Sequence, residues 1–444
     1  MRNSRFLADY GMVFVLLLLC AYFSVVTYKE QFPTGESAVE QVVASIHEQA
    51  GKTLRVLVIT GVQPGDTEFA DKLARDLAAS GAQVLGVAKG EPKDARELLK
   101  IAASGGKVDA IATTQTASEW VLFSDMNEDF PSLGAPRLIT PHSYRWPNFL
   151  KSENLLNIAN QIAIIAIIAI GMTMVIVTGG IDLSVGSLIA LSSVLATRFI
   201  RDYAGGTLAS PGGMVLACLT AVLLCGVVGA FTGTMVTRFD IPPFIVTLSM
   251  MLVGGGEAYS WAKGESIYQI PDSFIWLGRG ADLLHLPNAV VLMLVLYVLA
   301  HVLMSRTKLG RYLYAVGGNR EAARLSGVPV RRVIVFAYVA SAILAGVGGV
   351  IMASQLKSGS STYGKMYELY VIAAVVVGGT SLSGGEGKIF GTLIGAFTIA
   401  VIQNGMNLTG VNAENQLKVL GFVILGAVLL DKIRRKETSF TRHE

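Results

Sequence analysis

The stretch LNIANQIAIIAIIAIGMTMVIVT, residues 156–178, contains no charged residue and only a few polar ones. About 20 consecutive apolar residues are enough for a helix to cross the hydrocarbon core of a bilayer. This run therefore predicts a transmembrane helix, and nine further apolar runs lie elsewhere in the chain. The sequence predicts an α-helical polytopic membrane protein with about ten transmembrane helices, at 10–28, 156–178, 184–200, 213–236, 243–262, 287–304, 332–353, 367–382, 388–406 and 415–431.

The composition excludes an ordinary soluble protein. Hydrophobic residues make up 52% of the 444 residues and charged residues only 15%, and the mean hydropathy is +0.54. The 48 glycines suit close helix packing in lipid, where small residues let backbones approach. The basic residues gather at the ends of spans, so the net charge of +4 indicates orientation in a bilayer and not nucleic-acid binding. The three cysteines lack metal-ligand or disulfide spacing and are expected to be packing residues: Cys20, Cys218 and Cys225.

The distribution of Lys and Arg predicts the orientation, because these residues are enriched in cytoplasmic loops. Arg2 and Arg5 precede the first span, basic residues at 432–436 follow the last, and the loop 305–331 is strongly basic. Ten spans place all three on the same side, so both termini and this loop are expected in the cytoplasm. The first span resembles a signal peptide, but no small-residue cleavage site follows it, so a retained anchor is favoured.

Residues 30–145 are rich in Asp and Glu and read as an inserted soluble α/β domain on the extracytoplasmic side. Strand-like runs at 54–60, 82–87, 108–114 and 135–141 alternate with helical patterns at 66–80, 92–104 and 117–126. This alternation predicts a parallel, doubly wound sheet. The loop GVQPGD after the first strand lacks the G-x-G-x-x-G pattern of dinucleotide sites. The domains expected around the insertion are 1–29 (cytoplasmic tip and first helix), 146–436 (transmembrane core) and 437–444 (cytoplasmic tail).

Several polar residues lie at membrane depth and are candidates for a translocation path. TGGIDLSVGS, residues 178–187, places an acid beside an apolar helix, and an ionisable group there is a functional hypothesis by default. Asp182 and Ser184 are also good helix N-cap residues, so a purely structural role for this segment competes with the path. The remaining candidates for the path are Thr380, Ser381, Gln403, Asn404 and Asn407. These residues could instead form hydrogen bonds between helices.

The segment GRYLYAVGGNREAARLSGV, residues 310–328, is a basic, Gly-punctuated helical stretch between two long spans. It resembles the cytoplasmic coupling segment of ABC importer permeases of the ribose, xylose, arabinose and galactose class. TGGIDLSVGS at 178–187, IPPFIVTLSMM at 241–251 and VVVGGTSLSGGEGKIFGTLIGA at 375–396 resemble that class as well. The resemblance implies that the loop 306–331 couples to an ATPase through Gly310, Arg311, Ala315, Gly317, Gly318, Asn319, Ala322, Ala323, Arg324 and Gly327.

The resemblance also implies the surroundings of the chain. It implies a bacterial inner-membrane protein with a core like that of vitamin B12 importer permeases, embedded in lipid. A second permease protomer, identical or different, would complete the path. A cytoplasmic ABC ATPase would bind the ATP, and a periplasmic sugar-binding protein would deliver the substrate. The insertion at 30–145 resembles one lobe of such a binding protein, which leaves docking, regulation, a degenerate remnant or a spacer as its role.

The expected function is therefore a permease for a monosaccharide or similar small polyol, with the particular sugar open. LSGGE at 382–386 is similar to an ABC ATPase signature, but Gly387–Lys388 lacks the spacing and hydroxyl residue of a Walker A loop. No enzymatic activity, catalytic residue, cofactor or metal site is expected. An ion-coupled secondary transporter is the alternative, although Glu257, His301 and Glu368 lie only towards the ends of spans.

Overall fold

The computed structural model describes residues 2–33, 35–47, 54–63 and 65–440. It divides the chain into two compact units, each described here by itself. The α/β unit is Tyr28–Pro147, and the helical unit comprises residues 1–27 and 148–444. Each end of the α/β unit lies two residues outside the expected domain, 30–145.

The α/β unit begins and ends on a two-stranded ribbon, in which β1 (Tyr28–Gln31) pairs antiparallel with β6 (Tyr144–Pro147). Its main sheet has four parallel strands in the order β3-β2-β4-β5, as the alternating pattern predicted. The elements of this unit between the ribbon strands are α2 (Glu36–His47), β2 (Arg55–Thr60), α3 (Asp66–Ala79), β3 (Gln83–Lys89), α4 (Pro92–Ser104), β4 (Ala110–Thr113), α5 (Gln115–Ser118), α6 (Val121–Ser124), α7 (Met126–Asp129), η1 (Pro131–Leu133) and β5 (Arg137–Ile139).

Helices cover both faces of this sheet. The side chains of β2 alternate, so that Val56 and Val58 pack with Leu73 of α3 on one face. Leu57 and Ile59 pack on the other face with residues of α4 and of the segment that follows β4. A central strand buried on both faces needs a nearly continuous apolar run, which RVLVIT supplies. The predicted 117–126 helix is instead three short helices.

The helical unit contains a helix at each of the ten expected spans. Five described helices, α8, α10, α13, α16 and α18, are long and apolar enough to cross a bilayer by length and composition. The elements are α1 (Arg2–Val26), η2 (Asn148–Leu150), α8 (Ser152–Val177), α9 (Val185–Tyr203), η3 (Gly206–Leu208), α10 (Pro211–Arg238), α11 (Pro243–Ala262), η4 (Asp272–Ile275), α12 (Trp276–Arg279), α13 (Asn288–Arg306), α14 (Lys308–Gly318), α15 (Arg320–Leu325), α16 (Val330–Leu356), α17 (Tyr367–Val377), α18 (Ile389–Leu408) and α19 (Ala413–Phe440).

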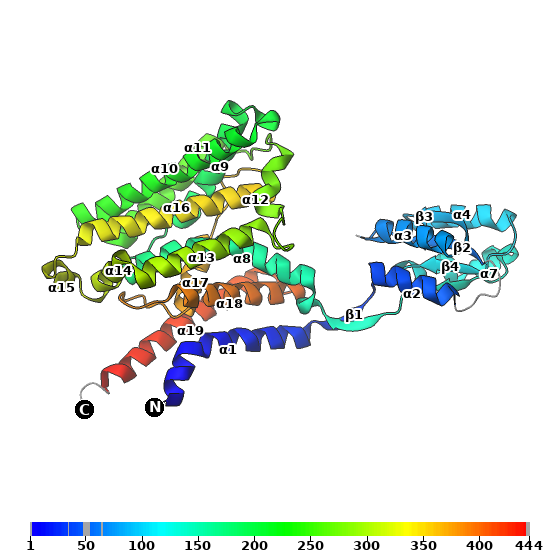
Figure 1. Cartoon of the computed structure of the whole chain (residues 1–444), viewed down its shortest axis with the longest axis horizontal. Coiled ribbons are helices and arrows are strands. Elements are labelled where there is room, and N and C mark those ends of the chain that lie inside the picture. The colour runs from blue at the N-terminus through cyan, green and yellow to red at the C-terminus, as the bar shows by residue number, and fades with distance from the viewer. Residues whose placement is uncertain (1, 34, 48–53, 64, 441–444) are drawn as a thin grey trace. The chain divides into compact units, whose positions relative to one another are not determined.

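Two helices organise the packing of this unit. α8 is buried along most of its length and contacts α13, α16, α17 and α18. α16 packs against α8, α9 and α10, and Figure 1 shows it running beside α10. The ten apolar runs therefore differ in their surroundings, because some are enclosed by other helices and others present an apolar face outward.

The structure changes the ends of two expected spans. The run at 367–382 is helical only as far as Val377, and a Gly-rich loop follows it. α17 is therefore an 11-residue helix, too short to cross a bilayer by itself. The uncertain run at 184–200 forms α9, which has 19 residues and extends to Tyr203.

Candidate functional site

A buried carboxylate joins the break between α8 and α9 to α16. Asp182 is 1% exposed. Its Oδ1 accepts hydrogen bonds from the backbone N–H of Ser184 at 3.0 Å and from the Ser184 hydroxyl at 2.6 Å. Its Oδ2 accepts a bond of 2.8 Å from the hydroxyl of Ser341, in the middle of α16. Asp182 therefore fixes the turn before α9 and fastens that turn to α16.

A second junction joins the end of α8, the end of α14 and the loop after α17. The backbone N–H of Gly385 donates to the carbonyl of Val177 at 2.9 Å, and the Tyr314 hydroxyl donates to the carbonyl of Gly387 at 2.7 Å. A Cβ at Gly317 would collide with that same Val177 carbonyl oxygen. This close approach requires glycine, so part of the expected coupling segment packs inside the chain itself.

The loop of this junction also holds the predicted Thr380 and Ser381. Both residues are 1% exposed. The backbone N–H of Ser381 donates to the carbonyl of Glu386, and the Ser381 hydroxyl accepts a bond from the N–H of Ser383, so Ser381 shapes the turn. The Thr380 hydroxyl has no hydrogen-bond partner among the described residues.

The short helix α15 is the exposed part of the coupling segment. The Asn319 side chain caps it by accepting a bond of 2.9 Å from the N–H of Ala322. At its end, the N–H of Val328 donates to Ala323 and that of Gly327, at φ 81°, donates to Arg324, which is the Schellman arrangement. Ala323 is 5% exposed, and it packs in the core of the helical unit.

One residue of this surface was not predicted from the sequence. Leu325, on α15, is 79% exposed and is the apolar side chain that α15 presents outward. Ala322 and Arg324 are exposed beside it, and Arg324 forms an ion pair of 2.7 Å with Glu321. Of the other predicted residues, Gly310 is buried and Gly317 is half-buried, whereas these are exposed: Arg311, Ala315, Gly318, Asn319 and Gly327.

The three predicted polar residues of α18 have different environments. Asn404 forms a reciprocal pair of amide hydrogen bonds with Asn154 of α8, at 3.0 and 2.8 Å. Asn407 accepts a bond of 2.7 Å from Gln416 of α19. Only Gln403 faces a cavity, which lies between α8, α16, α17 and α18.

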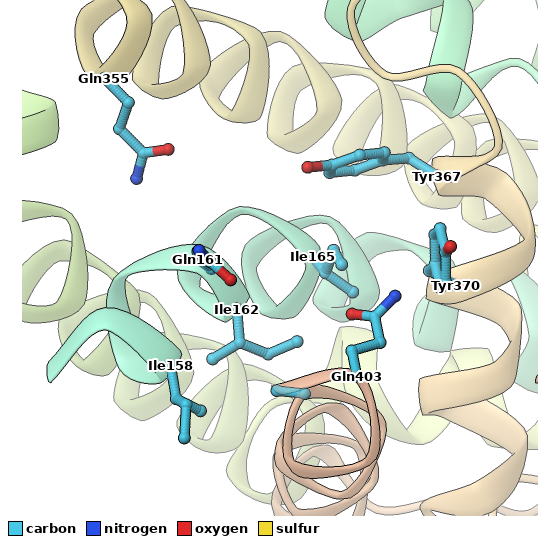
Figure 2. A pocket seen from close by; sticks show the side chains of 9 residues that line it. Ile158, Gln161, Ile162, Ile165, Gln355, Tyr367, Tyr370 and Gln403 are labelled. Carbon is cyan, nitrogen blue, oxygen red and sulfur yellow. The ribbon is translucent and has the colours of Figure 1, made fainter. Parts of the chain in front are cut away.

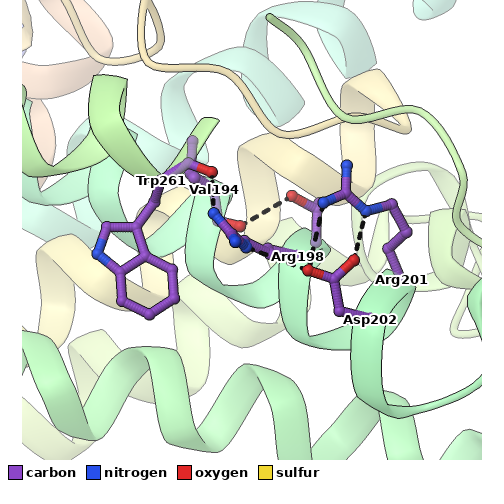
Figure 3. Close-up of polar contacts among 6 residues, drawn as sticks. Val194, Arg198, Arg201, Asp202 and Trp261 are labelled. Carbon is purple, nitrogen blue, oxygen red and sulfur yellow. Dashed lines mark hydrogen bonds and ion pairs between the residues drawn. The ribbon is translucent and has the colours of Figure 1, made fainter. Parts of the chain in front are cut away.

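A charged cluster fixes the end of α9 to the end of α11, as Figure 3 shows. Asp202 accepts from Arg198 at 3.1 Å and from Arg201 at 2.6 Å. The guanidinium carbon of Arg198 lies 4.9 Å from the centre of the Trp261 ring, and its N–H donates to the Trp261 carbonyl. This cluster lies at the opposite end of α9 from Asp182, so hydrogen bonds hold both ends of that helix.

Comparison with known proteins agrees with this architecture. The family model described as "Branched-chain amino acid transport system / permease component" matches residues 154–428. The ribose import permease protein RbsC of Escherichia coli is 40% identical over 325 residues, which are 72% of this chain and 98% of the relative. This chain belongs to that permease family.

Other relatives support the same family. RbsC of Bacillus subtilis is 43% identical over 304 residues, 68% of this chain and 92% of that protein. The D-allose transport system permease protein AlsC of Escherichia coli is 33% identical over 288 residues, 65% of this chain and 86% of that protein. No solved structure matches the chain.

The family membership determines the general class of the chain. It is a multi-pass inner-membrane permease subunit of an ABC importer and not an enzyme. In the described part of the chain, no group of three or more His, Cys, Asp and Glu side chains could hold a metal ion. The family match begins at residue 154, after the α/β unit has ended at Pro147. The α/β unit is therefore outside the matched region.

Proposed function

We propose that this permease forms the membrane path for a monosaccharide or similar small polyol, and that a separate cytoplasmic ATPase energises it. The relatives named for ribose and allose match this chain over 98%, 92% and 86% of their own lengths, and this observation carries the proposal. The periplasmic binding protein and the ATPase implied by the family complete the importer. A second permease protomer and the surrounding lipid would enclose the path.

The exposed helix α15 is the proposed contact with the ATPase. It is capped at both ends, so it is rigid enough to transmit a displacement. Ala322 and Arg324 flank Leu325, and a small, a charged and an apolar side chain together form a compact surface suited to a shaped cleft. An exposed apolar side chain contributes binding free energy when a partner covers it.

Two connections would carry movement of α15 into the helical unit. The first runs through α16, which follows α15 in the chain. Its Ser341 hydroxyl donates a hydrogen bond to Asp182. The second runs through α14 and the junction at Gly317, which contacts the end of α8. ATP-driven closure of the ATPase would move both connections together, because α14, α15 and α16 are consecutive in the chain.

The proposed topology has ten spans with both termini in the cytoplasm. The basic residues 305–331 and 432–436 support it, since such residues are enriched on the cytoplasmic side. With this topology the α/β unit, as an insertion at 30–145, is extracytoplasmic, and 146–436 is the permease core. The parallel sheet of the α/β unit supports its likeness to one lobe of a binding protein. We propose a docking or regulatory role for this unit.

The coupling proposal is tested by substitution of Leu325. Leu325→Asp places a charge at the centre of the α15 surface, and we expect both substrate uptake and substrate-stimulated ATPase activity to fall at least about tenfold, because an unpaired charge at an interface is costly. Ala322→Trp should act in the same direction through overpacking. Ala323 is unsuitable for this test because it lies in the chain's own core.

The matched control is Leu252→Asp, on α11. Leu252 is also exposed, at 69%, but it lies on the apolar helix α11 and not on α15. A charge at Leu252 should impair membrane insertion and not coupling. Normal membrane levels of Leu325→Asp with reduced ATPase stimulation therefore indicate lost coupling. Uptake and ATPase stimulation both unchanged in Leu325→Asp would contradict the docking role of α15.

A further inference from the structure

The helical unit contains a cavity of about 150 Å³ near one end of the bundle. Its polar lining comes from four helices: Gln161 from α8, Gln355 from α16, Tyr367 and Tyr370 from α17, and Gln403 from α18. Ile158, Ile162, Ile165 and Ala400 complete it. Its volume is well above the roughly 10–15 Å³ that one water molecule needs.

Most of these polar side chains have no hydrogen-bond partner among the residues that the structure describes. Figure 2 shows the amide groups of Gln161 and Gln403 and the ring of Tyr367 around a common space. Among the described residues, no hydrogen bond involves the side chains of Gln161, Gln403, Tyr367 or Tyr370, whereas Gln355 donates to the carbonyl of Asn160 at 3.1 Å. These four side chains are exposed or half-buried, so their unused donors and acceptors are open to a ligand or to ordered water that enters the cavity.

The chemistry of the lining selects one class of ligand. A Gln amide and a Tyr hydroxyl each offer both donors and acceptors, which match the hydroxyl groups of a polyol. None of the residues that line the cavity is charged. The ammonium and carboxylate groups of an amino acid would therefore lack ionic partners here, and burying unpaired charge is costly.

The aromatic rings favour the same class. Tyr367 and Tyr370 lie edge to face, with ring centres 6.2 Å apart. Together with the isoleucines of α8 they supply apolar surface for the C–H faces of a sugar ring, while the amides contact its hydroxyl groups.

We propose that this cavity is a saccharide-binding subsite that accepts a neutral polyhydroxylated ring and excludes amino acids. The proposal rests on the proposed function, because it places the substrate of that permease. The cavity lies towards the beginning of α8 and the end of α16, whereas α15 directly precedes the other end of α16. A ligand in the cavity would therefore contact the end of the bundle remote from the coupling surface.

Protection of an introduced cysteine tests the subsite directly. The full-length Ala400→Cys protein, in lipid nanodiscs, is labelled with a small thiol reagent in the presence of D-ribose, D-allose or L-leucine. Ala400 lines the cavity but contributes no polar group to it. The chain's own cysteines do not line the cavity, and labelling of the unsubstituted chain gives the background. A sugar at about twice its dissociation constant leaves about a third of the sites free, so labelling should slow about threefold, and L-leucine should have no effect.

Substitutions then test the individual side chains. Gln161→Ala and Tyr367→Phe in the Ala400→Cys background should remove the sugar protection, and in the complete importer each should lower uptake of the protecting sugar about tenfold, as expected when a ligand hydroxyl loses its partner. Tyr367→Phe retains the ring and removes only the hydroxyl, so its packing is preserved. Asn407→Ala is the control, because Asn407 lies one turn beyond Gln403 on α18 and contacts Gln416 outside the cavity.

Each outcome has a definite meaning. Protection by either sugar and not by L-leucine supports the subsite. Protection by L-leucine, or unchanged labelling with both sugars, overturns it. Failure of the Leu325→Asp test with sugar protection intact would refute the coupling proposal alone, whereas lost coupling without sugar protection would refute the subsite alone.

Discussion

At the residue scale, Asp182 is a buried acid whose contacts fix the turn before α9 to α16. Its two oxygens accept three hydrogen bonds, two from Ser184 and one from Ser341. The described part of the chain provides no ion pair for it, so neutral donors alone compensate its burial. Because Ser341 belongs to the helix that follows α15, rotation of α16 would strain this bond.

Removal of the Ser341 hydroxyl tests this link. Ser341→Ala leaves one oxygen of Asp182 buried without its donor, and such a loss typically costs about 1–3 kcal/mol of stability. We expect a lower midpoint of thermal unfolding and weaker coupling of ATPase activity to uptake. Ser249→Ala is the control, because the exposed Ser249 hydroxyl bonds only to its own helix at Ile245. An unfolding midpoint for Ser341→Ala equal to that of Ser249→Ala would refute the link.

In the α/β unit, the burial of Asp66 predicts that the free energy of unfolding of this unit depends on pH. Its carboxyl group is buried at the start of α3, and burial raises its pKa above the usual value, although the backbone N–H groups of Gln63 and Gly61 oppose the shift. Because the folded-state pKa is raised, the protonated carboxyl group contributes to the stability of the folded unit. This contribution is complete below the unfolded pKa of about 3.9 and is lost as pH rises through the folded pKa. At neutral pH the ionised group therefore destabilises the unit.

Asp66→Asn should consequently slow hydrogen exchange of the α3 amides at neutral pH. The stability of the unit should also depend less on pH. Glu68→Gln, which changes an exposed acid in the same first turn, provides the control. Faster exchange in Asp66→Asn than in Glu68→Gln at neutral pH would show that the ionised carboxylate stabilises the unit, contrary to this account.

At the element scale, the sequence predicted most helices and strands because their apolar periods are local properties. The run at 156–178 appears as α8, and RVLVIT appears as β2. The surroundings of polar residues could not be predicted in this way. Asn404 meets Asn154, which is 250 residues away in the chain, and its neighbour Gln403 faces the cavity.

The coupling segment illustrates the same limit. Its helical character follows from its sequence, but the sequence did not distinguish the buried Ala323 from the exposed Ala322. That difference depends on how α15 packs on the helical unit. Leu325 was overlooked because one leucine in a short amphipathic stretch normally predicts a buried face, whereas here the side chain is 79% exposed.

At the scale of the whole molecule, the chain combines a permease unit with an α/β unit that its family model does not include. The helical unit contains a short exposed helix, α15, buried junctions that connect this helix to the bundle, and an uncharged polar cavity. The α/β unit joins it through the antiparallel ribbon of β1 and β6, which brings its two ends together.

Sugar uptake by the reconstituted importer tests whether this chain is the permease of an ATP-driven sugar importer. Proteoliposomes would contain the full-length chain with its cognate ATPase, the binding protein would be added outside, and uptake of radiolabelled D-ribose and D-allose would be measured with and without ATP inside. An ATPase variant lacking its Walker A lysine provides the control. We expect uptake of one of these sugars only with ATP and the unsubstituted ATPase. Equal uptake without ATP, abolished by collapse of an ion gradient, would contradict this expectation and establish an ion-coupled secondary transporter.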